Sequence, residues 1–260
     1  MDIKTCNIIY CSPTHNSRDI ALAAGSALGS EPRTIDLTRD LSDSVIAIPA
    51  DEVAVIAVPV YAGRVAPFAL GRLRRLRGDA TPAILVVTYG NRDYEDALVE
   101  LHDAMTSQGF VTVAAGAFVG EHSYSRPGMP IGEGRPDSED VAVARRFGDR
   151  AASKLASAES VHEAAVAYVK GNRPYRSVST PTPTAPHTLD GCVLCGTCAD
   201  VCPTYAVRVT ATGVETDKNL CVKCCACVKE CPQKVRIFDT PYTEMLHKNF
   251  SSPREPELFF

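Results

Sequence analysis

The sequence predicts an α/β domain built on a parallel sheet, followed by a small cysteine-rich domain. Apolar runs alternate with helical patterns over roughly residues 1–170, which is typical of a sheet covered by helices on both faces. Nine of the eleven cysteines lie in the forty residues from Cys192 to Cys231 and therefore form one local site. Residues 171–187 between them are rich in proline, serine and threonine, so we expect a linker there.

Five segments of the first domain have the apolar, β-branched composition of buried strands. They are residues 3–10, 33–37, 53–58, 83–88 and 111–119. The spacing of apolar residues predicts helices over 17–28, 68–77, 94–107 and 138–169, the last as one long helix or two shorter ones. The expected fold is therefore a doubly wound, five-stranded parallel sheet.

Two further segments of the chain have less distinct patterns. The basic run at 72–77 is expected to be a solvent-exposed helix face, with a docking surface for an acidic electron donor as the alternative. Residues 241–260 have no clear hydrophobic period, so we expect a C-terminal tail.

The composition is that of an ordinary globular protein. A hydrophobic content of 45%, a charged content of 22% and a formal net charge of −4 give no reason to expect binding to nucleic acid. No apolar run approaches the ~20 residues that cross a bilayer, and the N-terminus does not have the pattern of a signal peptide. We therefore expect a cytoplasmic protein, in which clustered cysteines bind metal or act as redox thiols rather than form disulfides.

The cysteine-rich segment contains the spacing C-x2-C-x2-C-x3-C-P twice, beginning at Cys192 and again at Cys221. In this spacing three thiolates wrap one iron–sulfur cluster and the fourth reaches the other cluster. One [4Fe-4S] cluster is therefore assigned to Cys192, Cys195, Cys198 and Cys231. The other is assigned to Cys221, Cys224, Cys227 and Cys202. Residues 188–240 are accordingly expected to form an α+β domain with two clusters.

Two other interpretations of these cysteines were weighed. Structural zinc generally uses paired C-x2-C knuckles with a longer gap between them, which does not account for the third cysteine or the Cys-Pro ending. Disulfides conflict with the expected compartment. Cys225 is left over once both ligand sets are filled, and we interpret it as a small buried apolar residue near a cluster.

In a doubly wound sheet, ligands bind beyond the carboxyl ends of the strands. The loop after the first strand offers hydroxyl and amide side chains and opens a helix, a combination that suits a phosphate group. These side chains belong to Ser12, Thr14, Asn16 and Ser17. The same residues are also ordinary turn and N-cap chemistry, and both interpretations stay open.

The loops after the third and fourth strands each bring glycine and tyrosine to the same edge of the sheet. Gly63 accompanies Tyr61, and Gly90 accompanies Tyr89 and Tyr94. Glycine lets backbone N–H groups approach a planar ring system, and tyrosine can stack on that ring. The alternative is that the glycines only form turns and the tyrosines only cap the sheet.

These three loops, with the sequences CSPTHNSR, PVYAGR and TYGNRDY, resemble the cofactor loops of flavodoxins, and residues 188–240 resemble the bacterial two-cluster ferredoxins. The fusion is similar to the EFR1-type flavodoxin–ferredoxin fusion proteins of anaerobic bacteria. The resemblance implies FMN besides the two clusters, with the phosphate on Ser12, Thr14, Asn16 and Ser17. One side of the flavin would meet Pro59, Val60, Tyr61, Ala62 and Gly63. The other would meet Thr88, Tyr89, Gly90, Asn91 and Tyr94.

The chain departs from the flavodoxin pattern at two points. His15 stands where flavodoxins usually have glycine, and a histidine there is itself a candidate contact for the phosphate. The chain also contains no tryptophan, so tyrosine must replace the usual indole that stacks on the flavin.

The expected function is electron transfer between two [4Fe-4S] clusters and FMN, linking one-electron and two-electron partners in anaerobic metabolism. The alternative is an FMN-dependent reductase of a small organic substrate, fed by its own ferredoxin domain, with His122 or a loop tyrosine as the proton donor. In a third interpretation the clusters are only structural and the first domain has lost its flavin. Redox partner proteins are expected, but the sequence names neither donor nor acceptor, and a homodimer stays open.

Overall fold

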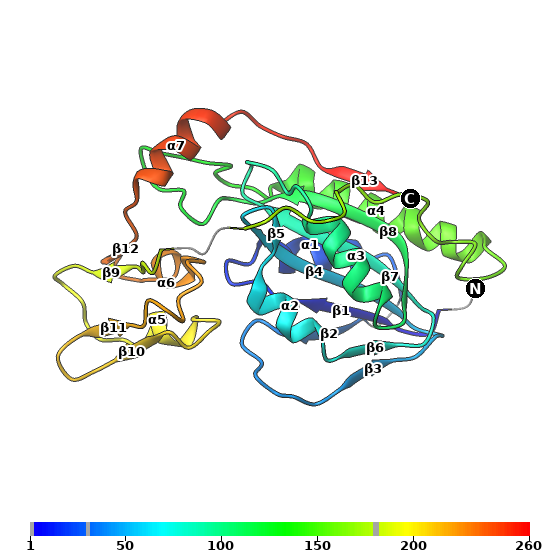
Figure 1. Ribbon diagram of the computed structural model, residues 1–260, viewed down its shortest axis with the longest axis horizontal. Helices are drawn as coiled ribbons and strands as arrows, with labels where there is room; N and C mark the ends of the chain where they lie inside the picture. The colour runs from blue at the N-terminus through cyan, green and yellow to red at the C-terminus, as the bar shows by residue number, and fades with distance from the viewer. Residues whose placement is uncertain (1–2, 30–31, 179–181) are drawn as a thin grey trace.

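The computed structural model describes residues 3–29, 32–178 and 182–260. Its main sheet has the order β13-β8-β7-β4-β1-β2 (Figure 1). Five of these strands are parallel neighbours: β2 (Arg33–Asp36), β1 (Cys6–Tyr10), β4 (Val53–Tyr61), β7 (Thr81–Tyr89) and β8 (Phe110–Val119). Numbered among themselves they run 2-1-3-4-5, the strand order of a flavodoxin-like doubly wound fold. The predicted fold class is confirmed.

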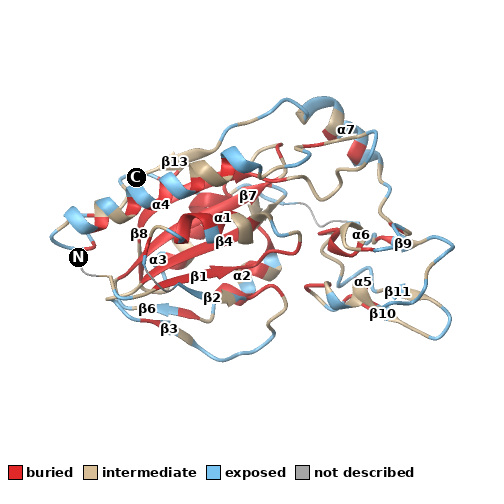
Figure 2. Cartoon of the chain, turned by 180° about the vertical axis from the view of Figure 1, so that it is seen from behind, coloured by how far each residue is buried: buried red, intermediate tan, exposed pale blue. Residues whose placement is uncertain are grey.

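Helices cover both faces of this sheet and divide the core into two layers. On one face α1 (Asn16–Gly25) and α4 (Ser138–Ser157) pack on residues such as Val55 and Val86. On the other, α2 (Pro67–Leu73) and α3 (Ala97–Thr106) pack on Ile56 and Leu85. Figure 2 shows the central strands largely buried, with β7 buried along its whole length and β4 buried up to Val58. This is why β4 and β7 read as unbroken apolar runs instead of alternating patterns.

The last helix of the first domain is single. A capping box at Asp137 starts α4, because the Asp137 side chain accepts from the N–H groups of Glu139 and Asp140. The helix ends at Ser157, where Ala158 turns to an extended conformation. Of the predicted span 138–169, only the first part is therefore helical.

The basic run is not a uniformly exposed helix face. Helix α2 ends at Leu73, and β6 (Leu76–Gly78) follows at once, paired with β3 (Ile46–Ile48). Arg72 is 8% exposed and donates to the carbonyl oxygens of Thr38 and Pro203. The expectation of a solvated face is wrong at Arg72, because its guanidinium satisfies carbonyl groups of two segments that are distant in sequence.

The expected C-terminal tail is folded onto the first domain. Residues 241–260 contain α7 (Pro241–Phe250) and β13 (Glu257–Phe259), which pairs antiparallel with β8. Strand β13 covers backbone groups that β8 would otherwise leave unpaired at the edge of the sheet. The ring of Phe260 also packs on Phe147, at 5.4 Å between centroids. Together with β5 (Arg64–Val65), β13 extends the predicted five strands to a seven-stranded sheet.

The predicted linker is packed at its start. The buried carboxylate of Asp96 accepts from the backbone N–H groups of Asn172 and Arg176. Residues 179–181 of the linker lie outside the described residues. The small domain begins with β9 (His187–Thr188), which pairs with β12 (Arg236–Ile237).

The small domain is α+β and lies beyond one end of the large sheet (Figure 1). Between β9 and β12 it contains α5 (Thr197–Asp200), the pair β10 (Val207–Val209) and β11 (Val214–Thr216), and α6 (Ala226–Lys229). The small domain contacts the loops after β1, β2 and β8, so it sits at the carboxyl ends of the parallel strands. Within residues 3–29, 32–178 and 182–260, no helix is long and apolar enough to cross a membrane.

Candidate functional site

Eight cysteines of the small domain line two separate cavities. The first is lined by Cys192, Cys195, Cys198 and Cys231. The second is lined by Cys202, Cys221, Cys224 and Cys227, together with Cys225. Each set takes three cysteines from one motif and the fourth from the other motif. Four thiols around a mostly apolar cavity are the donor set that a [4Fe-4S] cluster requires.

The sequence repeat is reproduced in the backbone. Gly196 (φ 87°) and Cys225 (φ 56°) both follow the second cysteine of their motif and cap the helices α5 and α6. Tyr205 and Lys234, each three residues after the last cysteine of its motif, also have positive φ. These left-handed residues fold each motif back on itself so that its first three thiols face one cavity.

Cys225 therefore stands where the first motif has a glycine. Its side chain is 2% exposed, lines the second cavity and has its Sγ atom 3.7 Å from the carbonyl oxygen of Lys223. A non-glycine residue in this conformation is strained unless its surroundings hold it. The placement agrees with a small buried residue beside the second cavity.

Backbone N–H groups surround two of the thiols. Ala206 N donates to Cys202 Sγ at 3.2 Å. Burial raises the pKa of Cys231, but hydrogen bonds from backbone N–H groups of residues 233–236 outweigh burial, so that the pKa is lowered. Donors of this kind stabilise a thiolate and tune the metal centre that it holds.

The loop after β1 contains a left-handed residue directly before a helix. His15 is in the left-handed region, with φ of 69°, and precedes α1. When a right-handed residue is followed by a left-handed one, their successive N–H groups point to the same side. The helix N-terminus adds a positive partial charge. Thr14 and Asn16 are partly exposed on this loop, and Asn16 Nδ2 donates to the carbonyl oxygen of Glu121.

Two other residues of the predicted phosphate loop are turned inward. Ser12 is buried, and its Oγ atom accepts from the N–H group of Arg18 at 3.0 Å. Ser17 is 1% exposed and shares a 2.7 Å hydrogen bond with the hydroxyl of Thr88. These hydroxyls join the loop to the end of β7.

His15 faces the small domain. Its Nε2 atom lies 3.2 Å from Oε1 of Glu230, the C-cap residue of α6. The sequence suggested this histidine as a phosphate contact, whereas its ring contact in the structure is a carboxylate of the other domain.

Tyr61 lies at the end of β4, in a hairpin closed by Ala62 and Gly63. Both turn residues have positive φ, as a two-residue hairpin turn requires. Pro59, Val60 and Tyr61 are half-buried, whereas Ala62 is exposed. Burial raises the pKa of the Tyr61 hydroxyl well above its usual value, and the nearby thiols of Cys224 and Cys225 add to the rise. The thiols of Cys224 and Cys225 are thus close enough to Tyr61 to act electrostatically on its hydroxyl.

Three side chains of the loop after β7 that the sequence suggested as cofactor contacts are buried. Tyr89 and Tyr94 are 3% and 0% exposed, and the Tyr94 hydroxyl donates to Glu257 of β13 at 2.8 Å. Asn91 is 1% exposed and its Nδ2 donates to the carbonyl oxygens of Phe250 and Ser252. The C-terminal segment covers these three side chains, so they are not open at the surface, and their contact with a ligand stays a prediction.

The imidazole of His122 packs directly over Gly90, in the loop after β7. A Cβ atom at Gly90 would lie 2.3 Å from His122 Cδ2, so only glycine lets the imidazole pack there. Burial, with Lys229 and Arg92 nearby, lowers the pKa of His122 to about 4. Nδ1 of His122 accepts from the N–H group of Tyr124 at 3.0 Å. The ring is thus neutral at pH 7 and fixed in orientation.

Tyr124 is a residue of this edge that the sequence pattern did not reveal. Its ring packs against His122, Phe238 and Tyr242, at 4.9, 5.2 and 6.3 Å between centroids. Burial and the thiols of Cys225, Cys221 and Cys224 raise its pKa. An aromatic residue in the 120–136 loop was the only available signal, and it did not indicate contact with the other domain.

Polar contacts hold the two domains at this edge. Besides the pair of His15 and Glu230, Lys229 Nζ lies 2.8 Å from Oε1 of Glu121. The Tyr205 hydroxyl donates to the carbonyl oxygen of Arg39 at 2.8 Å, and the Arg39 guanidinium lies over the Tyr205 ring. The cysteine cavities are thereby fixed relative to the loops of the sheet.

Comparison with known proteins assigns the first motif to a family. Residues 187–208 match the 4Fe-4S binding domain. A stretch of 44 residues is 48% identical to one of the subunits of the ion-translocating oxidoreductase complex of Methanosarcina acetivorans. It covers 17% of this chain and 17% of that protein, so the chain spans about a sixth of the length of this curated relative.

Solved structures similar to the chain include flavodoxins. A flavodoxin from the domain Archaea is 14% identical, with a TM-score of 0.41, over 58% of this chain and 99% of its own. Flavodoxin 1 of Bacillus cereus is 12% identical, with a TM-score of 0.41, over 58% and 98%. Rubredoxin oxygen:oxidoreductase of Desulfovibrio gigas is 12% identical, with a TM-score of 0.41, over 60% and 38%. The flavodoxin-like assignment itself rests on the strand order, and the chain joins that fold to a C-terminal 4Fe-4S ferredoxin region.

Proposed function

We propose that the protein transfers electrons between FMN at the carboxyl edge of the large sheet and two [4Fe-4S] clusters in the small domain. The observation that carries this proposal is that α6, the helix of Cys227, is held against the loops after β1 and β8, at the edge where doubly wound folds bind ligands. FMN exchanges one or two electrons and each cluster exchanges one, so the set would link one-electron and two-electron partners.

The two cysteine sets have different positions in this scheme. Cys221, Cys224, Cys227 and Cys202 would hold the cluster next to the flavin edge. Cys192, Cys195, Cys198 and Cys231 would hold the other, farther from Tyr61, where Cys195 is exposed at the surface. A partner protein would exchange electrons at this outer set, and the inner set would connect it to the flavin.

The residues of the sheet edge fit FMN in part. The loop of Thr14, His15 and Asn16 offers N–H groups and a helix N-terminus for the phosphate. Tyr61 offers one face of an aromatic ring. Since Tyr89, Asn91 and Tyr94 are covered, the opposite wall would come from His122, packed over Gly90, and from Tyr124.

A second candidate is the FMN-dependent reductase of a small organic substrate. It is favoured by the way α7 packs on the 120–136 loop, where His247 Nδ1 lies 2.8 Å from the carbonyl oxygen of Pro130 and Tyr242 meets Tyr124. This packing would shield the edge from bulk water. The depressed pKa of His122 counts against it as a proton donor at pH 7. Electron transfer is therefore preferred.

Anaerobic purification, metal analysis and acid extraction test the main proposal. We expect about eight irons and eight acid-labile sulfides per chain and release of FMN. A protein with zinc instead of iron, or with no flavin after reconstitution with FMN, would contradict it. Substrate turnover faster with the full chain than with a variant whose Cys224 is replaced by serine would favour the reductase.

A further inference from the structure

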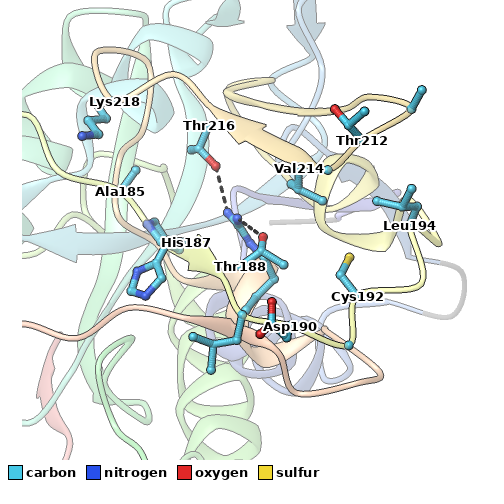
Figure 3. A pocket seen from close by; sticks show the side chains of 16 residues that line it. Ala185, His187, Thr188, Asp190, Cys192, Leu194, Thr212, Val214, Thr216 and Lys218 are labelled. Carbon is cyan, nitrogen blue, oxygen red and sulfur yellow. Dashed lines mark hydrogen bonds between the residues drawn. The ribbon is translucent and has the colours of Figure 1, made fainter.

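Arg236 is a buried cation in the small domain. It lies on β12 and is 2% exposed. Its Nη1 atom donates to Thr188 Oγ1 and its Nη2 atom donates to Thr216 Oγ1, both at 2.9 Å. Thr188 and Thr216 lie on different strands, β9 and β11, and Figure 3 marks a hydrogen bond at each hydroxyl. The group is thus held in one place by neutral acceptors.

Among the described residues, no carboxylate lies within ion-pair distance of Arg236. None of the ion pairs found within residues 3–29, 32–178 and 182–260 includes Arg236. Its Nε atom is buried without a hydrogen-bond partner. Burying an unbalanced guanidinium is costly, so a negative group must lie nearby in the functional protein.

Cysteine thiolates of both cavities are candidates for that negative charge. Arg236 Nη2 lies 3.7 Å from Sγ of Cys227, which lines the second cavity. Arg236 itself lines the first cavity, together with Cys198. The guanidinium also acts electrostatically on both thiols, in the direction that favours thiolate. It therefore stands between the two sets.

We propose that Arg236 is a shared counter-charge that raises the reduction potentials of both clusters. This rests on the proposed assignment of two clusters. Reduction adds one negative charge to a cluster, and a fixed cation nearby in a poorly solvated interior stabilises the reduced form. The effect is larger on the cluster of Cys227, whose sulfur the guanidinium contacts.

The test is an anaerobic redox titration, followed by EPR, of wild type, Arg236→Gln, Arg236→Lys and Arg208→Gln. Arg236→Gln should lower the equilibrium constant for reduction of the Cys227 cluster at least tenfold, or about 59 mV for a one-electron couple. Arg236→Lys keeps the charge and should restore most of the potential. Arg208→Gln removes the same charge from an exposed site paired with Glu215, and should leave both potentials unchanged.

The iron content of each variant distinguishes a wrong cluster assignment from a wrong role for Arg236. Wild-type protein without two clusters would overturn the assignment and this inference together. Arg236→Gln with full iron and unchanged potentials, or Arg236→Lys with the same shift as Arg236→Gln, would overturn only the role of Arg236. If Arg236→Gln does not retain iron, Thr188→Asp tests the inference instead, because it places a carboxylate beside the guanidinium at an open cavity. This variant should also lower the cluster potentials, and unchanged potentials would refute the inference.

Discussion

The Nζ atom of Lys229 lies 2.8 Å from the Oε1 atom of Glu121, and this ion pair joins α6 of the small domain to the loop after β8. Cys227 lies on the same short helix, and His122 is adjacent to Glu121. The pair therefore links the second cysteine cavity to the wall of the proposed flavin site. Both side chains are about a quarter to a third exposed, at 23% and 30%, so the pair is only partly screened by solvent.

Lys229→Ala should slow electron transfer between the domains without removing cofactors. The lost pair is worth about 1 kcal/mol or less, so we expect a several-fold slower rate and a weaker dependence on salt. Stopped-flow reduction, monitored at flavin and cluster wavelengths, measures the rate. Lys218→Ala changes an exposed lysine of the same domain and is the control. Equal rates in wild type and Lys229→Ala would show that this contact does not set the docking.

Cys224→Ser should lower the iron content, whereas Cys225→Ser should leave it unchanged. Cys224 belongs to a set of four thiols, so its loss should remove one cluster, or about four irons per chain. Cys225 adds a fifth thiol to the same cavity and should be replaceable with the iron retained. Iron analysis and EPR of the reduced proteins distinguish the two, and FMN should stay bound in both. Loss of iron from Cys225→Ser alone would reverse the assignment.

Tyr61→Leu should weaken FMN binding, whereas Tyr94→Phe should not. Tyr61 has a partly exposed ring at the sheet edge, and loss of aromatic stacking costs about 1 kcal/mol. Tyr94 is fully buried, so removal of its hydroxyl should instead lower the free energy of unfolding by about 1 kcal/mol through the lost bond to Glu257. Fluorescence titration of the apoprotein with FMN gives the affinities. Weaker binding by Tyr94→Phe would restore the role suggested from its sequence.

His122 should make the protein less stable as the pH falls below about 6.5. Its pKa is about 4 in the folded chain, below the usual value of 6.5, because burial and the cations Lys229 and Arg92 disfavour the imidazolium. The unfolded chain therefore binds the extra proton between these pH values, and folding stability is lost across that window as the pH falls. The thermal unfolding midpoint of wild type should drop between pH 7.5 and 5.5 by more than that of His122→Gln. Parallel curves for the two proteins would refute this assignment.

Much of the fold could be predicted because it follows from local patterns. Continuous apolar runs such as Val53–Tyr61 are typical of strands buried on both faces, and the paired Cys-Pro motifs indicate two matching turns. The structure groups the eight cysteines into the same two sets, and the clusters themselves stay a prediction. The sequence pattern did not reveal β13, because three residues are too few to show a period and their partner, β8, lies more than a hundred positions away.

The sequence by itself determined the doubly wound domain, the repeated cysteine motif and the loops that could meet a cofactor, since these depend on residue spacing within a few turns of chain. The tertiary structure decided which side chains remain available at that edge. The C-terminal segment covers Asn91 and Tyr94, while Tyr61 stays half-buried at the end of β4. It also placed Arg236 between the two thiol sets. Burial and charge at these positions depend on segments distant in sequence, which spacing alone does not bring together.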